Sequence, residues 1–164
     1  MLNLSKRQLN GIGFAVCAVL MGYALYVQHG LGMEPCPLCV FQRIALIALG
    51  CVFLLATLYN PTRTFGRIYA VLILLAAGVG IGIAGRHLWL QNLPKDQVPA
   101  CGPGLDFMLD AFPLREVLKT VLSGSGECAE VDWSLLGLSM PGWVVIAFTG
   151  LVLWGCWANL RRAA

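Results

Sequence analysis

Two cysteines with a short spacing suggest thiol–disulfide chemistry. Cys36 and Cys39 are separated by two residues in the segment EPCPLC at 34–39. Pro37 fits the first turn of a helix, because a missing N–H has no energetic cost there. Cys36 is then expected near the helix N-cap, where the positive end of the helix dipole stabilises a thiolate. The pair is therefore predicted to be redox-active.

The same spacing also occurs in many zinc sites, where such a pair supplies two of the four ligands. Structural zinc usually takes four ligands from two such short-spaced pairs. Cys101 and Cys128, which also lie outside the long apolar stretches, are far apart in the sequence and form no second short-spaced pair. We therefore expect no metal site, and zinc binding is the less favoured alternative.

Cys101 and Cys128 lie in a hydrophilic segment rich in glycine and proline. Cys101 precedes GPG at 102–104, and Cys128 follows SGSG at 123–126. Such sequences predict an irregular, accessible backbone. The two cysteines could form a structural crosslink, worth roughly 3.6 kcal/mol of loop entropy for a closed loop of about 28 residues. The accessible setting favours a disulfide that exchanges with a partner.

Arg43 and His87 are the titratable residues that accompany these cysteines. Arg43 follows Cys39 by four residues, so the two share one helix face at the start of an apolar stretch. An ionisable group there is a candidate functional residue, although an arginine can also extend to lipid phosphates. His87 lies beside Arg86 at the end of another apolar stretch. His87 is a candidate to form a hydrogen bond with a cofactor. The alternative, which also applies to Gln42, is a polar residue at the hydrated membrane interface.

The composition predicts that these residues lie on membrane-spanning helices. Hydrophobic residues make up 59% of the chain and charged residues 12%, against about 25% charged residues in soluble domains. A soluble domain of 164 residues could not bury so much apolar surface. A formal net charge of +3 is also too small to indicate a basic surface that binds nucleic acid. The fold class is predicted to be all-α, an integral membrane four-helix bundle.

Uncharged stretches place the four spans at about 9–28, 41–59, 68–89 and 143–160, each close to the ~20 residues that cross a bilayer. Backbone hydrogen bonds must close within each span in lipid, so the spans are helices. They form one domain over residues 1–164, with loops at about 29–40 and 90–142. The second loop is predicted to carry a short amphipathic helix, 113–122. A cleaved signal peptide is disfavoured, because the first apolar run exceeds the usual 7–15 residues.

Charge asymmetry predicts the orientation. All eight acidic residues lie on one side, whereas the other side holds six basic residues and no acid. Because positive residues mark the cytoplasmic face, both termini are predicted to be cytoplasmic and the two loops periplasmic, in a bacterial inner membrane. The six basic residues on the cytoplasmic side are Lys6, Arg7, Arg63, Arg67, Arg161 and Arg162.

This orientation separates the seven cysteines into two groups. Four lie on the outer, oxidising side, where disulfides persist: Cys36, Cys39, Cys101 and Cys128. Cys17, Cys51 and Cys156 lie within the spans. We expect these three to pack as small buried hydrophobes.

The chain resembles the bacterial disulfide bond formation protein B family, DsbB, over nearly its whole length. The resemblance rests on EPCPLCVFQR at 34–43, a cysteine at 101, GECAE at 126–130 and WSLLGLSMPGW at 133–143. By motif, Cys36 and Cys39 match the family's CxxC, while Cys101 and Cys128 match its loop disulfide. Arg43 matches the arginine of the quinone site, and His87 is a weaker match for a second residue there.

The resemblance implies a membrane oxidase that re-oxidises the periplasmic thiol oxidase DsbA. Reduced DsbA would attack Cys101, the released Cys128 would attack Cys36, and Cys39 would face a quinone, ubiquinone or menaquinone, of the respiratory chain. One alternative is a related enzyme serving another thiol partner. The other is a non-enzymatic membrane scaffold or metal-handling protein with structural disulfides.

Overall fold

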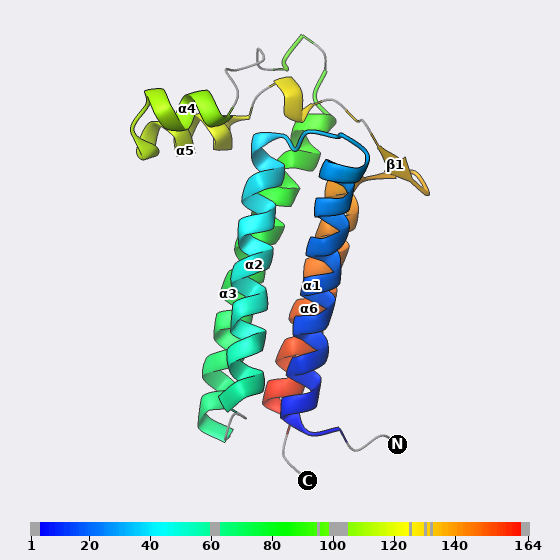
Figure 1. Cartoon of the computed structure of the whole chain (residues 1–164), viewed down its shortest axis with the longest axis vertical. Helices are drawn as coiled ribbons and strands as arrows, with labels where there is room; N and C mark the ends of the chain where they lie inside the picture. Colours follow the sequence, from blue (N-terminus) through cyan, green and yellow to red (C-terminus); the bar gives the residue numbers. More distant parts are fainter. Residues whose placement is uncertain are drawn as a thin grey trace.

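Four long helices form the body of the molecule (Figure 1). They are α1 (Lys6–Gly30), α2 (Pro37–Tyr59), α3 (Arg63–Gln91) and α6 (Met140–Leu160). The computed structural model describes residues 4–59, 63–94, 96–98, 105–124, 126–129, 131 and 133–161. All four helices are long and apolar enough to cross a membrane, and each of the four predicted spans lies inside one of them. The predicted all-α membrane four-helix bundle is confirmed.

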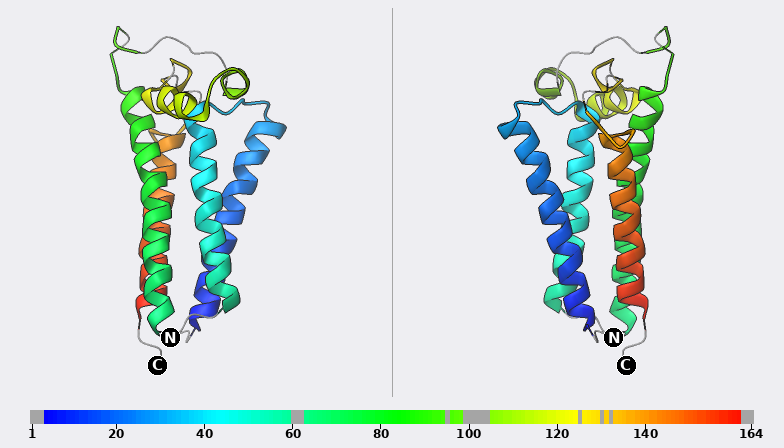
Figure 2. Two further views of the ribbon diagram at one scale, coloured as in Figure 1. Left: turned by 90° about the vertical axis from the view of Figure 1, so that its left-hand side faces the viewer. Right: turned by 90° about the vertical axis from the view of Figure 1, so that its right-hand side faces the viewer.

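The two ends of the bundle differ in structure. At one end α1 begins, α2 ends, α3 begins and α6 ends (Figure 1). We call this the amide end, because it contains Asn10 and Asn159. The other end carries the start of α2, the end of α3 and all the shorter elements (Figure 2). We call it the cysteine end, because it contains Cys36, Cys39 and Cys128.

The bundle core consists of apolar side chains from all four helices. α3 packs along α6, and α2 packs against both α1 and α3. Phe53 of α2 and Phe148 of α6 are the largest side chains of this core. Gly80 of α3 allows the close approach of α6, since a Cβ atom there would lie 2.5 Å from Cζ of Phe148. Small residues at such contacts are typical of membrane helix pairs.

Polar side chains fix the helix ends at the amide end. The side chain of Ser5 accepts a hydrogen bond from the Gln8 N–H, and the Gln8 side chain accepts one from the Ser5 N–H. This capping box satisfies two of the donors that a helix start leaves open. Asn10 of α1 and Asn159 of α6, both fully buried, exchange amide hydrogen bonds of 3.1 and 2.9 Å. α1 and α6 are thereby tied together.

The second predicted loop contains more structure than the sequence indicated. The predicted helix at 113–122 is confirmed as α5 (Leu114–Ser123), but α4 (Leu105–Ala111) and the 3₁₀ turn η1 (Gly126–Cys128) were not predicted. A hairpin of β1 (Ser134–Leu135) and β2 (Leu138–Ser139) was also not predicted. Its turn residues Leu136 and Gly137 both have positive φ, as in a type I′ turn. α4 and α5 lie transverse to the long helices (Figure 2).

The three cysteines of the spans differ in burial. Cys17 is buried in the bundle core, as predicted. Cys156 is half-buried and lies 3.9 Å from the carbonyl oxygen of Ala70. The expected packing role is wrong for Cys51, which is exposed on the outer face of α2. The burial of each cysteine depends on the helix face on which it lies. Apolar character alone does not say which face of a membrane helix meets its neighbours.

Candidate functional site

The CxxC pair lies at the first turn of α2. The helix begins at Pro37, so Cys36 occupies the N-cap position, as the sequence predicted. The N–H of Cys39 donates a hydrogen bond of 3.3 Å to Sγ of Cys36, which therefore acts as the helix cap. The two sulfur atoms are 2.8 Å apart, and both side chains are half-buried. A small movement brings them to the bonded distance of about 2.05 Å.

His87 reaches this pair from the end of α3. Its side chain is only 3% exposed. Nε2 lies 3.9 Å from Sγ of Cys36, and Nδ1 lies 4.0 Å from Sγ of Cys39. The burial excludes the wet-interface interpretation of His87. The imidazole instead contacts both sulfurs of the CxxC pair.

Gln42 contacts the same ring nitrogen of His87 that faces Cys39. It is buried on α2, and its Nε2 lies 3.1 Å from Nδ1 of His87. Sequence reasoning missed this pairing. Gln42 follows Cys39 by three residues and so shares its helix face, a signal that could have placed it at the site.

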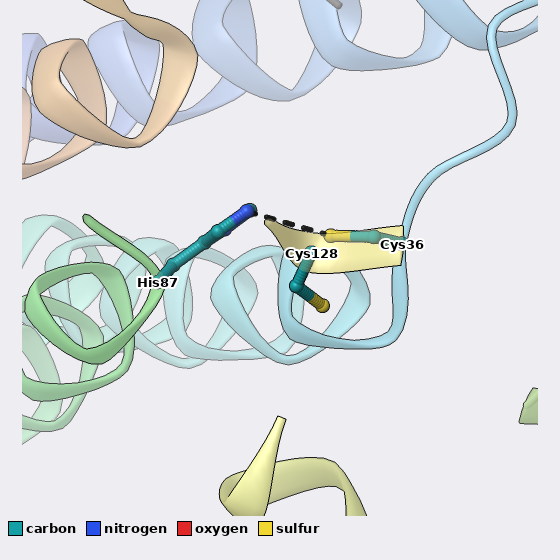
Figure 3. Close-up of side chains that lie close together, drawn as sticks. All are labelled: Cys36, His87 and Cys128. Carbon is teal, nitrogen blue, oxygen red and sulfur yellow. Dashed lines mark hydrogen bonds between the residues drawn. The ribbon is translucent and has the colours of Figure 1, made fainter. Parts of the chain in front are cut away.

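Cys128 enters the site from the second loop. It lies in η1, is 1% exposed, and packs in an apolar cluster with Leu38 of α2 and Leu90 of α3. Its Sγ, Sγ of Cys36 and a ring nitrogen of His87 all lie within 4.8 Å of one another (Figure 3). The structure therefore brings together two cysteines from different predicted pairs.

The end of α5 positions η1. Gly124 closes this helix with φ +91°, and its N–H donates to the carbonyl oxygens of Thr120 and Val121. Arg86 of α3 donates to the carbonyl oxygens of Leu122 and Ser123, at 3.2 and 2.9 Å. A cation at a helix C-terminus is favourable for both partners. Sequence reasoning missed this anchoring role of Arg86.

Arg43 points toward α1. It donates a hydrogen bond to Oε1 of Gln28 and another, of 3.1 Å, to the carbonyl oxygen of Ala24. Cys39, on the same helix face, has its contacts with Cys36 and His87 instead. Arg43 is thus part of the α1–α2 contact, one turn below the CxxC pair.

The described residues thus supply most of the predicted site. Cys36, Cys39, His87 and Cys128 form one cluster, and Arg43 lies one helical turn away. The predicted site residue Cys101 lies outside the described residues. A cluster of three cysteines with an imidazole can carry out thiol–disulfide exchange, because Sγ of Cys36 is close to both Sγ of Cys39 and Sγ of Cys128.

Comparison with known proteins gives one consistent family. A family model described as "Disulfide bond formation protein DsbB" matches residues 6–158. A protein of Nitrosococcus oceani named disulfide bond formation protein B is 53% identical over 156 residues, covering 95% of this chain and 92% of its own. A protein of Chromobacterium violaceum with the same name is 50% identical over 161 residues, covering 98% and 97%. With its four membrane-type helices and its CxxC pair at the start of α2, this chain belongs to the DsbB family of disulfide bond formation proteins.

Proposed function

We propose that this chain is a membrane thiol oxidase that re-oxidises a periplasmic DsbA-type oxidase and passes the electrons to a membrane quinone. The observation that carries this proposal is the contact between the two loops. Sγ of Cys128 lies within 4.8 Å of Sγ of Cys36, although the two residues belong to separate elements. Membership of the DsbB family supports a disulfide-forming activity.

This proximity supports the attack of Cys128 on Cys36, and the steps at Cys101 are those that the family resemblance implies. A thiolate of the reduced partner attacks Cys101, which breaks the Cys101–Cys128 disulfide and releases Cys128 as a thiolate. Cys128 then attacks Sγ of Cys36, which breaks the Cys36–Cys39 bond and leaves Cys39 as a thiolate. The second partner thiol displaces Cys101 and leaves as the oxidised partner. Cys101 then attacks Cys128, which re-forms the Cys101–Cys128 disulfide and releases Cys36 as a thiolate. Each step exchanges one S–S bond for another, so the two electrons end on the reduced pair Cys36 and Cys39.

An acceptor stronger than a cysteine pair must drive these steps. A DsbA-type oxidase has a potential of about −120 mV, whereas ordinary structural disulfides lie below about −300 mV. Oxidation of such a partner by an ordinary disulfide would therefore be unfavourable by about 8 kcal/mol. A bound quinone supplies a two-electron, two-proton acceptor that removes this deficit.

The donor groups around the CxxC pair fit a quinone. Quinone oxygens accept hydrogen bonds, and the guanidinium of Arg43 carries five N–H donors, two of which are given to Gln28 and Ala24. His87 is buried beside Cys39, and its ring nitrogens can donate or accept a hydrogen bond. Arg43 and His87 are the residues that would hold the quinone. Arg43 would also stabilise the Cys39 thiolate.

Orientation is tested with reporter fusions. A reporter fused after Pro61 should be cytoplasmic, and one fused after Gly124 should be periplasmic, because the basic residues mark the cytoplasmic face. Activities of a periplasm-dependent and a cytoplasm-dependent reporter are measured for each fusion. The opposite pattern would place the cysteine end in a reducing compartment and overturn the proposal.

Turnover tests the function itself. The purified protein in detergent is mixed with a reduced DsbA-type oxidase and a soluble ubiquinone or menaquinone analogue. We expect one quinone to be reduced for each partner dithiol oxidised, followed by quinone absorbance and by thiol counting. A related enzyme with another partner would oxidise a different dithiol but not DsbA. A scaffold protein would reduce no quinone.

Variants of Arg43 test the quinone site. Arg43→Met should raise the KM for quinone by about 10- to 150-fold, the equivalent of a charge-assisted hydrogen bond of roughly 1.5–3 kcal/mol. Arg43→Lys should lose only part of the quinone affinity, because an ammonium keeps the charge but lacks the planar donor set. The KM for the thiol partner should stay close to that of the wild type.

Gln28→Leu is the matched control. It removes the α1 partner of Arg43 but keeps the guanidinium, so it reports the loss of the α1–α2 contact alone. We expect it to leave the quinone KM nearly unchanged. Equal effects of Gln28→Leu and Arg43→Met would show that Arg43 acts only through helix packing.

A further inference from the structure

The trio Cys36, His87 and Cys128 has the donor chemistry of a metal site. Two cysteine sulfurs and one imidazole nitrogen lie within 4.8 Å of one another, and the three residues come from three separate segments of the chain (Figure 3). Thiolate and imidazole ligands select thiophilic ions such as Zn²⁺ over Mg²⁺ or Ca²⁺. This ligand set differs from the paired CxxC arrangement that the sequence spacing disfavoured.

The distances are close to those of tetrahedral zinc. Zn–S bonds of about 2.3 Å and Zn–N bonds of about 2.0–2.1 Å place neighbouring ligand atoms roughly 3.5–3.8 Å apart. Sγ of Cys36 and Nε2 of His87 are already 3.9 Å apart. The remaining separations, at most 4.8 Å, need a contraction of about 1 Å. Rotations of the Cys36 and Cys128 side chains can supply it.

Gln42 provides the outer support that a histidine ligand needs. A metal-bound imidazole usually donates its second ring N–H to a carbonyl or carboxylate oxygen. The side-chain amide of Gln42 lies 3.1 Å from Nδ1 of His87. With its carbonyl oxygen turned to the ring, it accepts the Nδ1–H and leaves the Nε2 lone pair directed toward Cys36.

The surroundings favour binding in one redox state only. His87 and Cys128 are 3% and 1% exposed, so an ion held there would be largely shielded from water. Cys36 can be a ligand only as a thiolate, which excludes the form in which it is bonded to Cys39. Sγ of Cys39 is 2.8 Å from Sγ of Cys36, which is closer than two sulfur ligands of one zinc ion can lie. The fourth ligand is therefore a water molecule, or Cys39 after its side chain has moved.

We propose that the reduced protein binds one Zn²⁺ ion through Cys36, His87 and Cys128. Binding displaces one proton from each of the two thiols and transfers no electrons. The ion is not a cofactor of the oxidase. It occupies the sulfurs that must pair during exchange, so zinc holds the reduced protein in an inactive form until it dissociates.

Metal binding is tested on the reduced, full-length protein in detergent without oxygen. Zn²⁺ is titrated against a chromophoric chelator, and Co²⁺ is used in parallel because thiolate ligands give it a charge-transfer absorption. We expect one ion per chain in the reduced protein and none at this site after oxidation. Cys36→Ser, Cys128→Ser and His87→Asn should each weaken binding by more than the 10- to 100-fold that is typical of an outer-shell partner.

Two further variants make the assignment specific. Gln42→Leu should weaken binding by about 10- to 100-fold while the thiolate absorption of bound Co²⁺ persists, as expected for an outer-shell residue. Cys51→Ser, on the outer face of α2, should bind as the wild type does. Wild-type affinity in His87→Asn would show a site made of cysteines alone and overturn the proposal. So would equal binding by the oxidised protein.

Inhibition is measured separately from binding. Zn²⁺ at a concentration that saturates the reduced wild type should stop dithiol oxidation, and a chelator should restore it. Binding without any effect on turnover would overturn the inhibitory role. Absence of quinone-dependent turnover in the metal-free protein would count against the proposed function and leave the binding result intact.

Discussion

At the amide end Asn10 and Asn159 exchange two hydrogen bonds of 2.9 and 3.1 Å, whereas at the cysteine end Cys36, Cys39 and His87 contact one another through sulfur at 2.8–4.0 Å. Both clusters lie against the apolar bundle; the amides and His87 are buried, whereas the CxxC sulfurs are half-buried. The amides have fixed donors and acceptors at short distances. The sulfurs are polarizable, bond weakly as donors and acceptors, and can form covalent bonds with one another.

The difference shows two uses of buried polarity in one fold. Among described residues, no buried side-chain nitrogen or oxygen lacks a hydrogen-bond partner, so the amide pair stabilises a single arrangement of α1 and α6. At the cysteine end Sγ of Cys36 lies 2.8 Å from Sγ of Cys39 and within 4.8 Å of Sγ of Cys128, which permits exchange between these two pairings. We therefore expect changes at the cysteine end to affect turnover and changes at the amide end to affect stability.

The largest expected effect follows removal of a sulfur at the cysteine end. Cys36→Ala should lower dithiol-dependent turnover by more than about a thousandfold, because the Cys36–Cys39 disulfide that Cys128 attacks can no longer form. Its unfolding free energy should fall by less than about 1 kcal/mol, the scale of a weak helix cap. Steady-state turnover and unfolding in detergent measure the two quantities. Residual turnover within tenfold of the wild type would place the chemistry elsewhere.

A smaller effect is expected when Cys128 is kept but the backbone that positions it is displaced. Gly124→Ala forces a Cβ onto a residue with φ +91° and within 2.5 Å of Cδ1 of Leu90. Because η1 and Cys128 follow directly, turnover should fall by between about 10- and 100-fold, as displacements near 1 Å do. Gly137→Ala is the control, since φ is +79° there but no atom lies within 4 Å. Equal losses in both variants would mean that strain alone, without displacement of Cys128, lowers turnover.

At the amide end the expected effect is on stability. Asn159→Ala removes the partner of the Asn10 amide and should lower the unfolding free energy by about 1 kcal/mol, since hydrogen bonds between membrane helices average about 0.6 and reach about 1.7 kcal/mol. The double variant with Asn10→Ala should cost less than the sum of the single variants. Turnover should be unchanged. A loss of turnover without loss of stability would connect the two ends and contradict their separation.

Of the cysteines between the two ends, Cys51 should give the smallest effect of all, and Cys17 an effect similar to that of the amide pair. Cys51→Ser, on the outer face of α2, should change the unfolding free energy by less than about 0.5 kcal/mol and turnover by less than about twofold. Cys17→Ser should lower stability by about 1 kcal/mol, because a hydroxyl replaces a buried thiol, with turnover again unchanged. A large loss of turnover in either variant would show that the spans take part in exchange.

Apolar runs of about 20 residues determined the four membrane helices from the sequence alone, because a backbone in lipid must satisfy its own hydrogen bonds. The CxxC pair at a helix N-cap was equally predictable, since Pro37 and the dipole act within one turn. The helix at 113–122 followed from its local periodicity. These features depend on short stretches of sequence.

Contacts between distant segments were decided only by the tertiary structure. The sequence paired Cys36 with Cys39 and Cys101 with Cys128, but packing of η1 against α2 and α3 places Cys128 beside Cys36 and His87. Likewise, Gln42 meets His87 and Arg43 meets α1 because of how the helices are rotated and packed. Local periodicity gives the faces of each helix, whereas the choice of which faces meet depends on side-chain packing summed over the whole bundle.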